Sequence, residues 1–132
     1  SSSSSSASTT GAGGYSSNDV HLLAKLIHAE ARGEPYQGQV AVGAVVLNRV
    51  KSSSFPNTIS GVIYQKYAFT CVSDGQINLA PDASSKKAAS DAMNGWDPSG
   101  GAIYYYNPKI ATSSWIFSRK TTVTIGDHVF AV

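Results

Sequence analysis

The chain has 132 residues and a formal net charge of +2, which suits one domain rather than several. Its ten Lys and Arg residues are scattered along the sequence, so the massed basic surface typical of nucleic-acid-binding proteins is excluded. Cys71 is the only cysteine, which excludes a disulfide within the chain, and no apolar run approaches the length needed for membrane insertion.

The start of the chain predicts a flexible linker. The first seventeen residues contain nine serines together with small Ala, Thr and Gly residues, and Tyr15 is the one large side chain among them. Such a segment buries too little apolar surface to offset the entropy lost on ordering. We therefore expect residues 1–17 to form a linker and residues 18–132 to form one folded domain.

Two helices are predicted at the start of the folded region. The first has apolar residues at helical spacing, with Ser17 or Asn18 as its cap and Gly33 at its end. The second covers residues 36–51 and follows Pro35, which suits the first helical position. This second helix is apolar almost all the way round, so we expect it to be the buried centre of the domain.

The rest of the chain predicts shorter helices followed by strands. A short helix is expected over residues 58–64, and Asp82 can cap a helix over residues 83–94. Because helices come first and strands last, the pattern indicates an α+β fold. The strand-like segments are residues 102–106, 115–118 and 123–131, with turns at Asn107-Pro108 and Gly126-Asp127.

Glu30 is the candidate general acid. Helical spacing places it in the apolar stripe of the first helix, opposite Lys25, His28 and Arg32. A carboxyl there loses its water, which favours the protonated form that a general acid needs. The same geometry equally fits a buried carboxylate held by an arginine or by backbone amides. Glu34, the other glutamate, is predicted to cap a helix or form a salt bridge, with a direct catalytic role as the alternative.

Aromatic residues are concentrated in the strand-like part of the chain. Sugar rings have apolar C–H faces beside hydroxyls, so a glycan cleft needs aromatic walls next to polar groups. Core packing accounts for such residues equally well. Side chains alternate along a strand, so Tyr105 should face one side of the sheet and Tyr104 and Tyr106 the other. The other aromatics of this set are Trp115, Phe117, Tyr67 and Phe69.

Two further kinds of site fit the sequence less well. His21 and His28 would lie ~10.5 Å apart along one helix, too far to share a metal directly, so we expect no metal site. Cys71 and His128 could form the nucleophilic pair of a cysteine peptidase. However, no helix start precedes Cys71 to favour its thiolate, and a small core cysteine is the simpler interpretation.

Several motifs follow one another along the chain after the linker. The longest is AEARGEPYQGQVAV, residues 29–42, followed by LNRV at residues 47–50. The others are SFPNTI (54–59), AFT (68–70), DGQI (74–77), AIYYYNP (102–108) and WIFSR (115–119). Together these motifs resemble the SleB/CwlJ family of cell wall hydrolases, which includes spore cortex-lytic enzymes, and the resemblance covers essentially the whole chain after the linker.

The resemblance implies a compact two-lobed, lysozyme-related fold, in which N-terminal helices and a small C-terminal antiparallel sheet surround a glycan cleft. It implies a catalytic domain that cuts peptidoglycan between MurNAc and GlcNAc, in the cortex-lytic members as a lytic transglycosylase that leaves 1,6-anhydro-MurNAc ends. Glu30 matches the catalytic glutamate of the family. Phe69, Tyr105, Asn107 and Trp115 match motif positions that we assign to the substrate cleft.

The resemblance also implies a secreted protein that acts on peptidoglycan at the cell wall or spore cortex, without a cofactor. We expect a monomer, with a wall-binding domain upstream in the full-length protein. A lytic transglycosylase needs one acid/base, whereas glycosidases that use water need a second carboxylate ~5–9.5 Å away, for which Asp74 is the candidate. A non-catalytic peptidoglycan-binding module and a wall amidase or peptidase that uses Cys71 are the alternatives.

Overall fold

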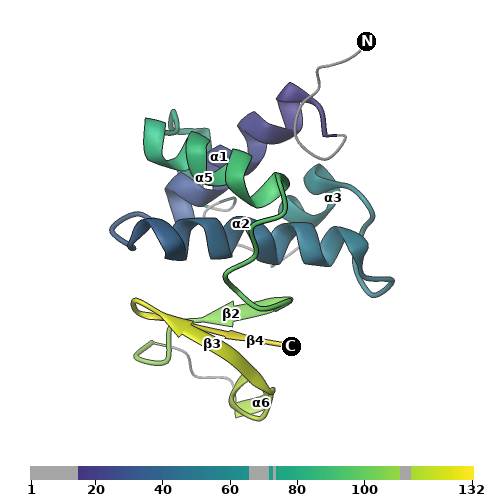
Figure 1. Ribbon diagram of the computed structural model, residues 1–132, viewed down its shortest axis with the longest axis vertical. Helices are drawn as coiled ribbons and strands as arrows, with labels where there is room; N and C mark the ends of the chain where they lie inside the picture. Colours follow the sequence, from purple (N-terminus) through teal and green to yellow (C-terminus); the bar gives the residue numbers. More distant parts are fainter. Residues whose placement is uncertain (1–14, 66–71, 73, 111–113) are drawn as a thin grey trace.

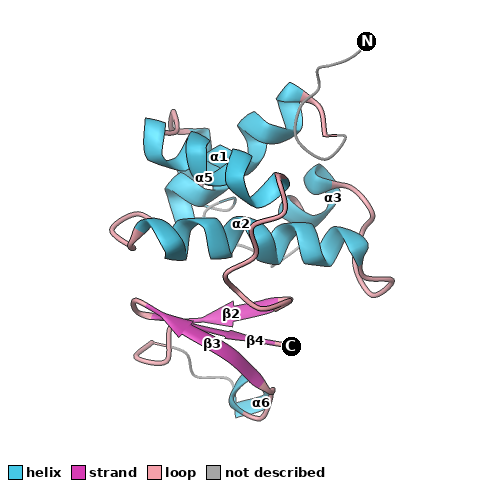
Figure 2. Cartoon of the chain, in the orientation of Figure 1, coloured by secondary structure: helices cyan, strands magenta, loops and turns pink. Residues whose placement is uncertain are grey.

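The computed structural model describes residues 15–65, 72, 74–110 and 114–132. Helix α2 (Tyr36–Lys51) runs through the middle of the molecule, with the other long helices on one side and a small sheet on the other (Figure 1). Helices α1 (Ser17–Glu30) and α5 (Ala83–Met93) pack against α2 and against each other. The long helices precede the strands in the chain, which confirms the predicted α+β class (Figure 2).

Helix α1 begins earlier than predicted. Its N-cap is Ser16, not Ser17 or Asn18: the Ser16 side chain accepts a hydrogen bond from the Asp19 N–H at 3.2 Å, and the Asp19 carboxylate accepts one from the Ser16 N–H at 3.3 Å. This reciprocal pair is a capping box. Tyr15 also packs against the core, so the folded part starts before residue 18.

The end of α1 determines where Glu30 lies. The helix stops at Glu30 with Ala31 as its C-cap, before the predicted end at Gly33, which has a φ of +86°. Pro35 is the N-cap of α2 rather than its first helical residue, because its ψ of 159° is extended. A short connection therefore turns the chain directly from Glu30 into the central helix.

Helix α2 has the predicted bounds, and its apolar residues are buried as expected. Neighbouring helices approach it closely at Gly43, where a Cβ atom would lie 3.0 Å from the Ile27 side chain and 3.3 Å from Ala92. The absence of a side chain at this position lets α1 and α5 pack on the same part of α2. The core therefore lies mainly between these three helices.

The remaining helices begin at side-chain caps. Thr58 caps α3 (Ile59–Ile63), and Asp82 caps α5 by accepting a hydrogen bond from the Ser85 N–H at 2.7 Å. The hydrogen bonds from Ser85 lower the pKa of Asp82 below its ordinary value. The 3-10 helix η2 (Gln76–Asn78) lies between α3 and α5 in the chain. None of the described helices is long and apolar enough to cross a membrane.

The sheet contains three antiparallel strands in the order β2 (Tyr104–Tyr106), β4 (His128–Ala131), β3 (Thr121–Ile125). Cross-strand partners share a face of a sheet. The register pairs Tyr105 with Phe130, and Phe130 with Val123, so these three side chains lie on the inner face, which packs against the helices. Tyr104 and Tyr106 lie on the outer face, which confirms the predicted alternation.

The prediction of a strand over residues 115–118 is wrong, because this segment forms the short helix α6 (Ser114–Phe117). Ile116 is buried, while Trp115 and Phe117 on either side of it are exposed. A single helical turn and a strand both place adjacent residues on different sides, so this three-residue pattern does not distinguish them. Figure 1 shows α6 beyond the sheet, on the side away from the helices.

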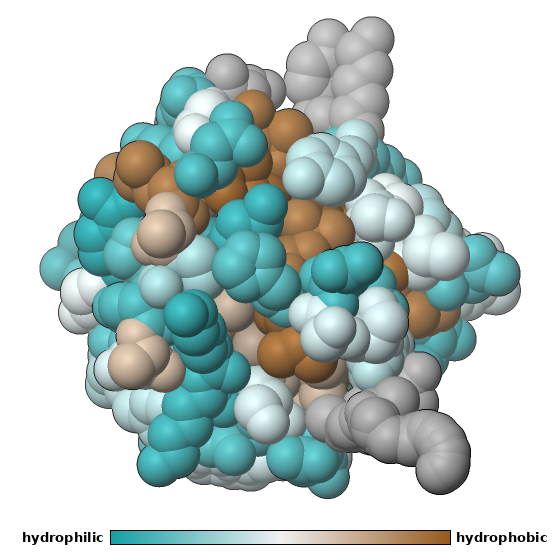
Figure 3. Space-filling view, turned by 90° about the horizontal axis from the view of Figure 1, so that it is seen from above, coloured by the Kyte–Doolittle hydropathy of each residue, from teal (hydrophilic) through white to brown (hydrophobic). Residues whose placement is uncertain are grey.

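Hydrogen bonds from α2 attach the sheet to the helical part. The Arg49 Nε donates to the Ile103 carbonyl at 2.7 Å, and the Asn48 amide donates to the Ala102 carbonyl at 3.0 Å. Both carbonyls immediately precede β2, so the start of this strand is fixed on the central helix. Seen from above, the helical side of the molecule shows apolar side chains between hydrophilic ones (Figure 3).

Candidate active site

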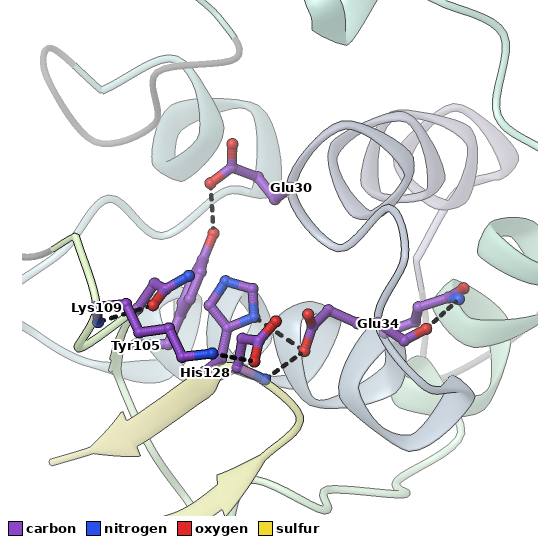
Figure 4. A network of polar contacts seen from close by, with 8 residues as sticks. Glu30, Glu34, Tyr105, Lys109 and His128 are labelled. Atoms are coloured by element: carbon purple, nitrogen blue, oxygen red, sulfur yellow. Dashed lines mark hydrogen bonds and ion pairs between the residues drawn. The ribbon is translucent and has the colours of Figure 1, made fainter.

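Glu30 faces the sheet from the last turn of α1. Its side chain is half-buried, and Oε1 accepts a hydrogen bond from the Tyr105 hydroxyl at 2.7 Å. Figure 4 shows the second carboxylate oxygen turned away from this hydroxyl. The bond joins the helical part to the sheet, so Glu30 is oriented by a residue from the opposite half of the domain.

Tyr105 is itself held by neighbours on the inner face of the sheet. Its ring stacks on Phe130, with centroids 5.9 Å apart, and meets the His128 ring edge-on, with centroids 5.4 Å apart. Phe130 is fully buried in the core. Packing of this kind restricts the tyrosine ring and therefore the position of its hydroxyl.

Glu34 and His128 form a second contact between the helical part and the sheet. The Glu34 Oε1 lies 3.3 Å from the His128 Nδ1, and their side chains are only 10% and 15% exposed. The Nδ1 atom has no well-aligned hydrogen-bond partner, so this is a close contact rather than a hydrogen bond. Oε1 also accepts a hydrogen bond from the Asp127 N–H at 3.2 Å. Glu34 therefore contacts both His128 and the turn that precedes it.

The turn between β3 and β4 is shaped around the Glu34 carboxylate. Gly126 has a φ of +58°, and a Cβ atom there would lie 2.2 Å from the Glu34 Oε1. Only a residue without a side chain leaves room for the carboxylate at this point. Figure 4 shows Glu30, Tyr105, His128 and Glu34 as one continuous row of side chains.

The other predicted cleft residues do not all come together. Asn107 is half-buried directly after β2, and its Oδ1 accepts a hydrogen bond from the Lys109 N–H at 2.9 Å, which stabilises the turn. Trp115 lies against Tyr104 on the outer face of the sheet, so the structure separates it from Tyr105 and Glu30. Asp74 is exposed next to η2. Phe69 lies outside the described residues, as do Tyr67 and Cys71.

The histidines have different environments. His28 lies 3.8 Å from the Asp82 carboxylate, and His21 is exposed. Within the described part of the chain, no three His, Cys, Asp or Glu side chains gather in a way that could hold a metal ion. The contact between His128 and Glu34 was not predicted from the sequence, where His128 was a candidate only as a partner of Cys71. His128 and Phe130 are two positions apart on one strand, so their side chains lie on the same face of the sheet. The sequence could therefore have predicted that His128 faces inward.

Comparison with known proteins relates this geometry to peptidoglycan enzymes. A family model described as "Cell Wall Hydrolase" matches residues 33–131. This match begins just after Glu30 and includes Glu34, Tyr105 and His128. The "Spore cortex-lytic enzyme" of Bacillus cereus is 60% identical over 117 residues, which are 89% of this chain and 45% of the relative. The chain thus spans less than half the length of that protein.

A further curated relative and two solved structures extend the comparison. "Cell wall hydrolase CwlJ" of Bacillus subtilis is 37% identical over 121 residues, covering 86% of this chain and 84% of the relative. The catalytic domain of the germination-specific lytic transglycosylase SleB from Bacillus anthracis has a TM-score of 0.85 and 58% identity, covering 90% of this chain and 98% of that one. The catalytic domain of the Bacillus cereus SleB protein has a TM-score of 0.87 and 55% identity, covering 97% of this chain and all of that one.

Proposed function

Because this chain belongs to the cell wall hydrolase family, we propose that it cleaves the glycan strands of peptidoglycan between MurNAc and GlcNAc, with Glu30 as the acid/base. The observation that carries this proposal is the hydrogen bond between Tyr105 and Glu30 across the two halves of the domain. A general acid must be held within reach of the leaving oxygen, and a fixed tyrosine hydroxyl restricts where the carboxyl can point.

The proposed reaction is that of a lytic transglycosylase. Protonated Glu30 gives its proton to the glycosidic oxygen as the bond from that oxygen to C1 of MurNAc breaks. The resulting carboxylate then takes the proton of the MurNAc 6-hydroxyl, whose oxygen attacks C1 and closes the 1,6-anhydro ring. Glu30 ends protonated. The reaction therefore needs no second carboxylate and consumes no water.

The placement of the other carboxylates supports a reaction with one acid/base. The Glu34 carboxylate is occupied by His128 and by the Asp127 N–H, so its role is to hold the hairpin. A glycosidase that uses water would need a second carboxylate about 5–9.5 Å from the first. For such a reaction the exposed Asp74 is the residue to test first.

The substrate side of the proposal draws on the relatives. Proteins named spore cortex-lytic enzymes and a structure titled as a germination-specific lytic transglycosylase support spore cortex peptidoglycan as the substrate. Tyr105 and Asn107 would line the cleft that receives it; Phe69 is assigned to the cleft by the family resemblance alone. We further propose that the full-length protein is secreted and monomeric, needs no cofactor, and carries an upstream wall-binding domain, joined by the part of the predicted linker that precedes Tyr15.

Replacing Glu30 by Gln tests the proposal. The variant keeps the size of the side chain and can still accept from Tyr105, so circular dichroism should show an unchanged fold. Lysis of decoated spores or purified cortex, followed by turbidity, should nearly stop. Mass spectrometry of the wild-type products should show 1,6-anhydro-MurNAc ends, whereas reducing MurNAc ends would point to water as the nucleophile.

The two rival functions give different results in the same assays. A non-catalytic binding module would leave the cortex opaque even with the wild-type protein. A wall amidase or peptidase would lose activity on Cys71→Ala substitution and would retain it in Glu30→Gln. Undiminished lysis by a folded Glu30→Gln protein would contradict the proposal directly.

A further inference from the structure

The outer face of the sheet carries an aromatic surface that the proposed reaction does not use. Tyr104 and Tyr106 lie on the face of the sheet opposite Tyr105, and the edge of this face reaches α2, where the Arg49 guanidinium lies 5.8 Å from the centre of the Tyr104 ring. Helix α6 covers part of this face with the buried Ile116. The rings of Trp115 and Phe117 remain 55% and 48% exposed.

These rings form two neighbouring clusters on the same face of the sheet. Trp115 stands edge-on to Tyr104 at 5.5 Å between centroids, and Phe117 stands edge-on to Tyr106 at 5.2 Å. Phe55, from the loop after α2, extends the set by contacting Tyr104 at 6.0 Å. Single exposed apolar residues need no explanation, whereas a contiguous exposed set marks an interaction site. We call these five residues the outer aromatic surface.

Positive charge borders the outer aromatic surface. The Arg119 guanidinium lies 4.8 Å from the centre of the Tyr104 ring, and its Nε donates to the Val132 carbonyl at 3.1 Å. Lys120 beside it is also exposed. Residues 98–126 contain no Asp or Glu, so this part of the chain supplies cations and aromatic rings without any carboxylate.

We infer that the outer aromatic surface is a second binding site for peptidoglycan, separate from the cleft at Glu30. Aromatic rings suit the apolar C–H faces of sugars, and the neighbouring cations suit the carboxylates of the peptide stems. A second copy of the chain fits less well, because residues 98–126, which carry this surface, offer no Asp or Glu to pair with Arg119 and Lys120 of the other copy. This inference rests on the proposed function, since both faces would bind the same polymer.

Two binding faces on one small domain should help it to act on an insoluble substrate. The outer aromatic surface would hold one segment of the polymer while the inner face acts on another, which raises the local concentration of cleavable strands. The gain applies only to a crosslinked polymer that offers several strands at once. A short soluble strand can occupy one face at a time and gains nothing.

Binding is measured in the Glu30→Gln background, which leaves the polymer intact. Purified insoluble peptidoglycan is sedimented with the protein, and the bound fraction gives Kd. Replacing Trp115 and Phe117 together by Ala should weaken binding about tenfold, and Arg119→Gln should make binding less sensitive to salt. Trp96→Ala is the matched control, because Trp96 is 44% exposed but belongs to the helical part, near Tyr36.

Activity in the Glu30-containing protein gives the second readout. The double substitution should lower the cleavage rate on both substrates to different extents. The fold-loss on insoluble peptidoglycan should be at least about five times the fold-loss on soluble uncrosslinked strands. Equal losses on both substrates would assign the rings to the cleft and overturn the inference. Unchanged Kd would also overturn it, as would a concentration-dependent dimer that the substitutions abolish in analytical ultracentrifugation. None of these results touches the proposed function, which depends on Glu30→Gln alone.

Discussion

The hydroxyl of Tyr105 lies 2.7 Å from Oε1 of Glu30, although the two residues are 75 positions apart in the chain. One comes from the end of the first helix and the other from an edge strand of the sheet. The hydrogen bond therefore exists only when the helical part and the sheet are correctly assembled. The orientation of the Glu30 carboxyl, the proposed acid/base, therefore depends on the whole domain.

Tyr105→Phe should lower turnover without unfolding the protein. The substitution removes the hydroxyl and keeps the ring that packs on Phe130 and His128. Glu30 becomes a carboxylate as it gives up its proton, and a hydrogen bond to a charged group contributes about 1.5–3 kcal/mol, so the rate should fall about 10- to 100-fold. Initial rates on soluble glycan strands would show the loss mainly in kcat.

The control for this experiment is the neighbouring tyrosine. Tyr106 lies on the outer face of the sheet, so Tyr106→Phe removes a hydroxyl that does not reach Glu30. Its kcat on the same soluble strands should stay within about twofold of wild type, because surface changes away from the reacting groups are usually small. A Tyr105→Phe enzyme with wild-type kcat would contradict the role assigned to this hydrogen bond.

Glu34→Ala should destabilise the domain strongly. The substitution leaves His128 without its anionic partner and the Asp127 N–H without its acceptor, in a region where both side chains are largely buried. Leaving a buried polar group without its partner costs about 1–3 kcal/mol. Urea denaturation of Glu34→Ala and Glu34→Gln separates the contributions, because glutamine keeps an acceptor oxygen and should lose less. Equal stability of both variants and wild type would show that the contact is not stabilising.

The sequence predicted the central helix well and the site only in part. Helix α2 has the expected bounds because it is apolar on all sides, so tertiary packing agrees with the local pattern. Glu30 was identified from helical periodicity and from the family resemblance. The partnership of Glu34 with His128 joins residues 94 positions apart, and no local pattern encodes it. The segment around Ile116 was misassigned because one buried residue between two exposed ones fits a strand and a helical turn alike.

Asp82→Ala should reduce stability at neutral pH and have less effect in acid. The hydrogen bonds from Ser85 hold the pKa of Asp82 below its ordinary value of 3.8, so the folded state favours the carboxylate. This contribution is present above the unfolded-state pKa and is lost as pH falls through the lower pKa of the folded state. Replacing a capping Asp by Ala costs about 1 kcal/mol at neutral pH.

Asp82→Asn provides the matched control for the pH dependence. Asparagine caps a helix about as well as aspartate but does not titrate, so this variant should stay close to wild type at neutral pH. Thermal unfolding from pH 7 down to pH 2.5 should show the wild-type and Ala proteins converging below pH ~4, the ordinary range of an aspartate pKa. A constant difference between them across this range would mean that the carboxylate does not act through its charge.

Gly126→Ala should destabilise the domain more than the same change at Gly101. Both residues have positive φ, at +58° and +87°, so alanine is strained at either position. At Gly101 a Cβ atom would meet nothing within 4 Å, whereas at Gly126 it would lie 2.2 Å from the Glu34 Oε1. Strain alone should cost about 1 kcal/mol, and displacing the carboxylate should add about 1–3 kcal/mol at Gly126.

Combining Gly126→Ala with Glu34→Ala tests whether the clash is the cause. Removing the carboxylate also removes the atom that the new Cβ would meet, so the double variant should be more stable than the sum of the two single losses. Urea denaturation of the four proteins gives the coupling free energy. Simple additivity would mean that Gly126 is needed only for the backbone geometry of the turn, and that Glu34 can move aside without loss.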